Sequence, residues 1–185
     1  SCAMGTGGTL SGVSMYLREH VPGFKSFLTD PQGALPYTFY TTGEMKMGQG
    51  SSITEGIGQG RITKNMEGYR PDHAWEITDT EALEELNRLT IEEGLQLGLS
   101  SGINVAGAIK VAKHLGPGHT VVTILCDSAS RYNSKMYNAP FLRGKSLPVP
   151  EWIDSEKKDV GVESVMGVDL RSLLEEARAG TEMSA

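Results

Sequence analysis

Gly5-Thr-Gly-Gly-Thr-Leu-Ser-Gly12, the glycine stretch, is the part of the chain that decides the fold. The apolar positions at its end and beyond are spaced by three and four residues: Leu10, Val13 and Leu17. The pattern predicts a tight turn that leads into a helix over about residues 10–19. Glycines let the backbone approach a ligand closely, and free N–H groups at a helix start attract anions. Residues 5–9 therefore predict a phosphate cup, to which the hydroxyls of Thr6 and Thr9 add donors.

Two common phosphate-binding motifs do not fit the glycine stretch. A dinucleotide fingerprint needs a third glycine where Leu10 stands, and a Walker loop needs a lysine that the stretch lacks. From these residues alone, a glycine-rich turn without a ligand remains an open alternative.

Composition describes an ordinary globular chain of 185 residues, long enough for one domain with a hydrophobic core. A formal net charge of −6 argues against nucleic acid as a partner. The sequence has no run of eighteen apolar residues and no signal peptide, which favours a cytoplasmic protein. Cys2 and Cys126 do not make a disulfide framework, and the four histidines have no metal-ligand spacing with them, so we expect no metal site.

Strand-like and helix-like segments alternate along the chain, which predicts a parallel α/β sheet. The expected strands are 25–29, 73–77, 95–99 and 120–126, the last of them a continuous apolar run typical of a strand buried on both faces. The other expected helices are one that starts at the capping box Thr78-Asp-Thr-Glu81 and stops near Gly94, and one over 103–114. Residues 32–72 are expected to form a long functional loop and 100–102 a turn. The glycine stretch, Ser100-Ser101 and Asp127 would all lie at carboxyl ends of strands, where such sheets bind ligands.

Composition changes after Phe141, and Pro148 and Pro150 mark a linker. We therefore expect a domain over 1–150 and an acidic tail over 151–185, with one short amphipathic helix over 169–178. Only four residues precede Gly5, which is the end of a strand and not a whole one. We expect the chain to be the C-terminal part of something longer.

Four stretches, in order and at matching spacings, resemble the cysteine synthases (O-acetylserine sulfhydrylases), a family of fold-type-II pyridoxal phosphate enzymes. They are the glycine stretch, Thr54-Glu-Gly-Ile-Gly-Gln-Gly60, Glu92-Glu-Gly-Leu-Gln-Leu-Gly-Leu-Ser-Ser-Gly102 and Asp127-Ser-Ala-Ser-Arg-Tyr132. Residues 141–152 also look like the tail of bacterial or fungal members. The resemblance covers about residues 1–152 and implies the tryptophan synthase β-like α/β fold, incomplete at the N-terminus. It also implies a homodimer of the complete enzyme.

The resemblance implies roles for individual residues. Ser101 would hydrogen-bond the pyridine nitrogen of pyridoxal 5'-phosphate, with Ser100 as the other candidate. Gly56 and its neighbours would line the substrate side of the ring. The cofactor phosphate would be held by Gly5, Thr6, Gly7, Gly8 and Thr9.

The reaction that the resemblance implies is β-replacement: O-acetylserine and sulfide give cysteine and acetate. A neutral hydroxyl at the pyridine nitrogen, in place of a carboxylate, favours loss of a β-substituent over transamination. The family's Schiff-base lysine and its substrate-carboxylate loop lie upstream of the glycine stretch, so we expect no catalytic residue in this chain. It would then work only with its N-terminal part.

Other assignments stay open. Cystathionine β-synthases, cysteine desulfhydrases and serine or threonine dehydratases use similar features, and a non-catalytic subunit could retain the phosphate cup. Cys126 stands where many relatives have proline, and we expect it to be a small buried residue.

Overall fold

The structure, a computed structural model, describes residues 1–154. Contacts between Cα positions divide the chain into two units, Ser1–Pro150 and Glu151–Ala185. Of the second unit the structure describes only a short 3₁₀ helix, η3 (Glu151–Ile153), and Asp154. The helix expected over 169–178 lies outside the described residues.

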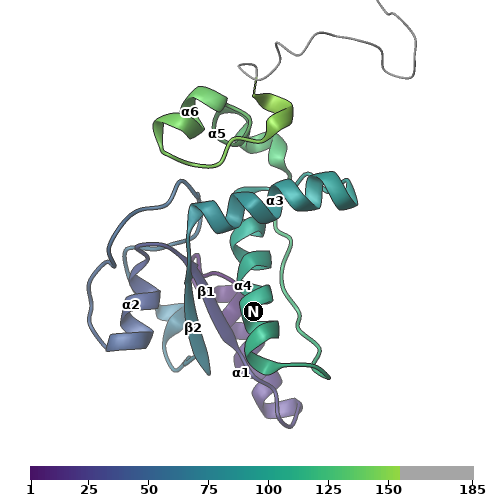
Figure 1. The fold of residues 1–185 in the computed structure, drawn as a ribbon. Coiled ribbons are helices and arrows are strands. Elements are labelled where there is room, and N and C mark those ends of the chain that lie inside the picture. The colour runs from purple at the N-terminus through teal and green to yellow at the C-terminus, as the bar shows by residue number, and fades with distance from the viewer. Residues whose placement is uncertain (155–185) are drawn as a thin grey trace, which may run out of the picture. The chain divides into compact units, whose positions relative to one another are not determined.

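Parallel strands form the centre of the first unit (Figure 1). Strands β1 (Phe27–Pro31) and β2 (His73–Ile77) pair in parallel, with Leu28 opposite Ala74. On the other edge of β1, Cys2 forms a parallel bridge to Leu28. The prediction of an α/β fold with a parallel sheet is thus confirmed.

Helices cover both sides of these strands. In Figure 1, α2 lies on one side of β1 and β2 and α4 lies on the other, and both helices contact both strands. The longer helices are α1 (Gly8–His20), α2 (Leu35–Thr42), α3 (Asp79–Glu93) and α4 (Leu99–Leu115). The short ones are η1 (Lys64–Met66), η2 (Ala129–Tyr132), α5 (Asn133–Met136) and α6 (Ala139–Gly144).

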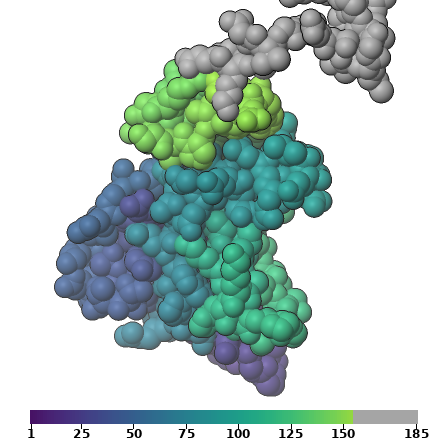
Figure 2. Space-filling model, viewed as in Figure 1, coloured from purple at the N-terminus to yellow at the C-terminus, as the bar shows by residue number. Residues whose placement is uncertain are grey.

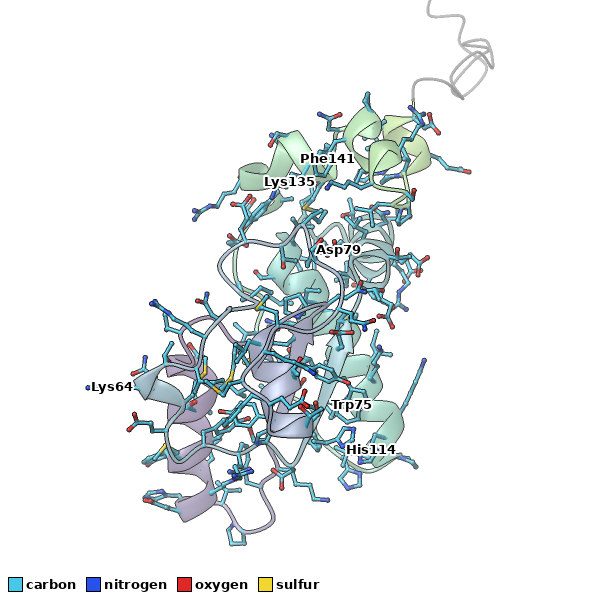
Figure 3. The ribbon with its side chains drawn as sticks, turned by 90° about the vertical axis from the view of Figure 1, so that its left-hand side faces the viewer. Lys64, Trp75, Asp79, His114, Lys135 and Phe141 are labelled. Atoms are coloured by element: carbon cyan, nitrogen blue, oxygen red, sulfur yellow. The ribbon has the colours of Figure 1, made fainter. Side chains whose placement is uncertain are left out.

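The strands contribute side chains to two hydrophobic clusters, because successive residues of a strand point to opposite faces of the sheet. Leu28 and Ala74 belong to one cluster, together with Cys2, Met4, Leu10, Met66 and Tyr69. Ile77 belongs to the other, together with Ala82, Ile103 and Ala106. At its far end α4 meets the sheet through aromatic rings, where His114 lies 5.3 Å from Trp75 between ring centroids (Figure 3).

Local signals explain why α3 begins and ends where it does. The Thr78 hydroxyl accepts a hydrogen bond from the Glu81 amide at 3.2 Å, and the Glu81 carboxylate accepts one from the Thr78 amide at 2.9 Å. This is the predicted capping box. The helix ends at Gly94, whose φ of 69° is left-handed. Strand β2 also has its predicted bounds, whereas β1 begins two residues later than predicted.

The predicted strand 95–99 and turn 100–102 are wrong. Leu97 forms only an isolated antiparallel bridge to Ser128, and α4 already begins at Leu99. Gly98 is the N-cap residue, and its carbonyl accepts hydrogen bonds from the amides of Ser101 and Gly102. Serine and glycine are common in turns but also at helix starts, and here packing decides for the helix: a Cβ on Gly107 would overlap the Thr29 side chain, so α4 lies directly on β1.

The predicted buried strand 120–126 is also wrong. Val122, Ile124 and Leu125 are 68%, 42% and 49% exposed, and among the described residues no strand pairs with this segment. Side chains hold it instead: the Asn104 amide on α4 donates to the Ile124 carbonyl at 2.8 Å. Cys126 is exposed, so the prediction of a buried cysteine is wrong as well. A continuous apolar run predicts a buried strand, but such a strand is buried only where other elements cover both of its faces.

The glycine-rich region 32–72 is partly ordered into helices that were not predicted, α2 and η1. Pro36 stands in the first turn of α2, where its missing N–H is tolerated, and Gly43 ends the helix with a φ of 80°. The rest of the region is irregular, but in the space-filling view its blue atoms form a continuous surface against the teal atoms of α3 (Figure 2).

Candidate functional site

The glycine stretch turns into a helix through Gly7, the N-cap of α1. Its φ of 85° lies in the left-handed region, and a Cβ there would also come within 2.6 Å of Met66 Cγ. No hydrogen bond from a described side chain caps this helix start. The first N–H groups of a helix have no partner within it, so those of α1 are available to an anion. Thr6, Gly8 and Thr9 are exposed around this start.

A second loop lies directly on the glycine stretch. A Cβ on Gly5 would come within 2.6 Å of the Gly56 carbonyl oxygen, so the two backbones are in contact. The Gly58 amide donates to the Met4 carbonyl at 3.2 Å. Beyond this loop, η1 packs against α1, and Lys64 on η1 extends away from the molecule (Figure 3). The structure therefore joins two of the four stretches that carried the family resemblance.

Gly56 also lines a cavity of about 500 Å³. The other lining residues come from the start of α4 and from the chain after residue 125: Glu55, Ile57, Ser100, Cys126, Asp127, Arg131 and Tyr132. No lysine is among these described lining residues. The cavity thus draws on the other two stretches of the resemblance, and its volume is in the range of small-molecule sites.

The two serines at the start of α4 have different environments. Ser100 lines the cavity from the first turn of the helix. Ser101 is 0% exposed, and its hydroxyl accepts a hydrogen bond from the Cys126 amide at 2.9 Å. One serine therefore faces the cavity, and the other ties the cavity wall to α4.

A polar group of three side chains forms one wall of the cavity. The Tyr132 hydroxyl donates to Asp127 Oδ2 at 2.8 Å, and Arg131 Nε lies 3.9 Å from the same oxygen. Burial, followed by the hydrogen bond to Asp127, raises the pKa of Tyr132. Asp127 Oδ1 is buried and accepts no hydrogen bond from the described residues. This oxygen packs against Gly98, where a Cβ would come within 2.1 Å of it.

Lys135 on α5 fastens the loop that carries Gly56. Its ammonium group donates to the Ile53 carbonyl at 2.9 Å and pairs with the Glu55 carboxylate at 2.6 Å. The hydrogen bond from the Lys135 ammonium group to Glu55 and its positive charge lower the pKa of Glu55. The cavity lining from 55 to 57 is therefore held from the α5 side.

An apolar groove of about 440 Å³ lies apart from this cavity, between α1 and the segment 119–124. Its lining includes Thr9, Leu10, Val13, Leu17 and Val122. Thr9, a predicted phosphate ligand, therefore lies at this groove and not in the cavity that Gly56 and Ser100 share. Sequence reasoning did not single out Glu55 or Arg131, although both stand inside stretches that carried the resemblance.

Comparisons with known proteins agree with this arrangement. The family model described as pyridoxal-phosphate dependent enzyme matches residues 1–127. Cysteine synthase 1 of Neurospora crassa is 45% identical over 157 residues, which cover 82% of this chain and 42% of that protein. Cysteine synthase 1 of Emericella nidulans is 45% identical over 151 residues, covering 80% and 41%.

A solved structure, the O-acetylserine dependent cystathionine β-synthase from Helicobacter pylori, superimposes with a TM-score of 0.62 at 33% identity, covering 72% of this chain and 41% of that one. The chain thus spans about two fifths of the length of the relatives that it matches.

Proposed function

This chain belongs to the family of pyridoxal-phosphate dependent enzymes, and we propose that it is the cofactor-phosphate-binding part of a cysteine synthase, which converts O-acetylserine and sulfide into cysteine and acetate. The observation that carries the proposal is the meeting of the Gly5 and Gly56 loops beside a cavity with Ser100 at a helix start. The identity of 45% to two proteins named cysteine synthase 1 supports the same reaction.

The residues present fit pyridoxal phosphate at its phosphate end. Gly5, Thr6, Gly7, Gly8 and Thr9 surround the start of α1, where uncapped N–H groups and the helix dipole favour a dianion. A Cβ on Gly56 would meet no atom within 4 Å, so this loop leaves open space beside the cup. These residues would bind and orient the group without taking part in bond making.

At the ring end, Ser100 and Ser101 are the two candidates for a hydrogen bond to the pyridine nitrogen. The cavity geometry supports Ser100, because Ser100 is among the residues that line the cavity and Ser101 is not. The positive end of the α4 dipole would disfavour a proton on that nitrogen. When bound, pyridoxal phosphate supplies the electron sink for loss of the β-substituent.

The apolar groove supports a proposal about the missing part of the enzyme. We infer that the N-terminal part, which would carry the Schiff-base lysine, packs against α1 and residues 120–126. Exposed Val13, Val122 and Ile124 support this, since soluble proteins rarely leave such surfaces open together.

The domain boundary near 150, the homodimer of the complete enzyme and a cytoplasmic location are proposals that rest on sequence and resemblance. No described helix is long and apolar enough to cross a membrane.

Cystathionine β-synthase activity is a second candidate, because one structural neighbour is named an O-acetylserine dependent enzyme of that kind. The two activities share the leaving group and differ in the nucleophile. The test supplies the complete, cofactor-loaded enzyme with O-acetylserine and either sulfide or homocysteine, and measures cysteine and cystathionine. Cysteine as the faster product supports the proposal, and cystathionine as the faster product supports the alternative. Neither product from an enzyme that binds pyridoxal phosphate would indicate a non-catalytic subunit.

A further inference from the structure

The sheet beside β1 stops at Pro31 for a chemical reason. The Cys2 amide donates to the Phe27 carbonyl at 3.3 Å, and the Thr29 amide donates to the Cys2 carbonyl at 3.2 Å. In a parallel ladder the next two bonds on this edge would run from the Met4 amide to the Thr29 carbonyl and from the amide of residue 31 to the Met4 carbonyl. Pro31 has no N–H, so the second of these bonds cannot form. Neither bond is present, and the chain leaves the ladder at Met4.

Met4 finds other partners at this point. Its amide donates to Asp30 Oδ1 at 2.9 Å, and its carbonyl accepts from the Gly58 amide at 3.2 Å. Met4 is 1% exposed, so both backbone groups need these bonds. Gly5 follows immediately and begins the phosphate cup. The Asp30 side chain therefore replaces the ladder where the chain turns toward the cup.

Asp30 is an unusual side chain to find in this core. It is 0% exposed, and its Oδ2 has no hydrogen-bond partner among the described residues. Burial raises the pKa of Asp30 to about 7, against the amides of Met4 and Tyr37, which lower it, while the charge of Glu76 raises it further.

Among the described residues, the ionisable groups that act on Asp30 include no cation. Those that act on it or respond to it are Glu76 from β2, Tyr40 from α2 and the thiol of Cys2. A buried carboxyl with no cation beside it lowers the stability of the folded state. The hydrogen bond that Asp30 accepts from the Met4 amide therefore indicates a role other than packing.

We propose that Asp30 is a positioning residue for the glycine stretch: by accepting the Met4 amide outside the sheet, it sets the direction in which residues 5–9 leave β1 and so the geometry of the phosphate cup. The inference rests on the proposed function, because the cup is where the cofactor phosphate would bind.

Two substitutions at Asp30 separate positioning from charge. Asp30→Asn keeps an oxygen that can accept from Met4, and Asp30→Leu keeps the branching at Cγ but removes the acceptor. The test measures the dissociation constant of pyridoxal phosphate for the complete enzyme and the ³¹P resonance of the bound cofactor. We expect Asp30→Leu to weaken binding about tenfold and to shift the resonance, since a hydrogen bond is lost. Asp30→Asn should stay within about threefold of the wild type, with its resonance unchanged.

Pro31→Ala gives an independent test that leaves Asp30 in place. An N–H at position 31 would compete with the Gly58 amide for the Met4 carbonyl and extend the ladder, so cofactor binding should weaken and exchange of the Gly58 amide should quicken. Leu142→Ala is the control, because Leu142 is buried in α6, which contributes no residue to the glycine stretch, to the Gly56 loop or to the cavity lining, so its truncation destabilises the fold without removing a proposed cofactor contact.

The outcomes distinguish this inference from the proposed function. A wild-type enzyme that binds no pyridoxal phosphate would overturn the proposed function and this inference with it. Wild-type binding with unchanged affinity in Asp30→Leu, or equal weakening in Leu142→Ala, would overturn this inference alone. If Asp30→Leu does not fold, unchanged affinity and ³¹P resonance in Pro31→Ala would overturn it.

Discussion

Alanine at Ser100 and alanine at Ser101 should fail in different ways. Ser101→Ala leaves the Cys126 amide without its acceptor, which lies 2.9 Å away in the wild type. An unsatisfied, partly buried donor costs about 1–3 kcal/mol of folding free energy. For a chain of this size each kcal/mol lowers the melting midpoint by about 2–4 °C. Ser100→Ala removes a hydroxyl that faces the cavity, so its melting midpoint should change by less than about 2 °C.

Turnover should fall more in Ser100→Ala than in Ser101→Ala. If Ser100 is the partner of the pyridine nitrogen, its loss removes a hydrogen bond worth about 1–3 kcal/mol and lowers kcat about tenfold to a hundredfold. The phosphate cup still anchors the cofactor, so its affinity should change much less. Ser100→Asp is the sharper variant, because a carboxylate there favours a proton on the nitrogen, and pyridoxamine phosphate should become detectable as a product of transamination.

The assay combines thermal unfolding with cysteine formation from O-acetylserine and sulfide, both on the complete cofactor-loaded enzyme. One result would refute the geometric reasoning: Ser101→Ala loses turnover at an unchanged melting midpoint, while Ser100→Ala retains it. The role would then belong to Ser101, as the family resemblance implies. If neither serine affects turnover or product, the assignment of pyridoxal phosphate to this cavity is wrong.

Four further predictions follow from individual contacts. Thr9→Ala removes a donor from the phosphate cup and should weaken pyridoxal phosphate binding about tenfold to a hundredfold; an unchanged dissociation constant would remove Thr9 from the site. Lys135→Met releases the loop at Ile53 and Glu55 and should quicken hydrogen exchange of residues 53–57, and exchange equal to the wild type would show that the loop is held elsewhere. Because burial raises the pKa of Asp30 from 3.8 to about 7, the folded state holds a proton that the unfolded state releases, so the free energy of unfolding should fall as pH rises from about 4 to 7. In Asp30→Asn this fall should be smaller, as measured by urea unfolding at each pH. The chain 1–185 made alone should aggregate through its apolar groove, and a monodisperse sample with cooperative unfolding would contradict that.

Much of the architecture could be predicted because its signals are local. The capping box at Thr78 and the left-handed Gly94 specify α3, and β2 ends directly before that capping box. The glycine stretch predicted a turn into a helix, and α1 begins at Gly8, two residues earlier than expected. Each of these features depends on backbone conformations and hydrogen bonds between residues close in sequence, so the sequence alone contains the information.

The errors concern segments whose state depends on distant neighbours. Residues 120–126 have the composition of a buried strand, but burial requires covering elements, and Val122 is 68% exposed. The 100–102 segment carries turn residues, yet the contact of Gly107 with Thr29 brings the whole of α4 onto β1. Composition cannot distinguish these outcomes, because it does not contain the positions of the packing partners.

The sequence by itself determined the family, the parallel α/β class and the glycine stretch, since these follow from motifs and from short-range periodicity. It also contained the proline at 31, whose missing N–H ends the ladder. Only the tertiary structure decided that Asp30 meets Met4, that Gly5 touches Gly56, and that Ser100 faces the cavity while Ser101 supports its wall. Each of these contacts joins segments at least 25 residues apart in sequence, and hydrogen bonding and burial at that range are set by how the layers pack and not by any local pattern.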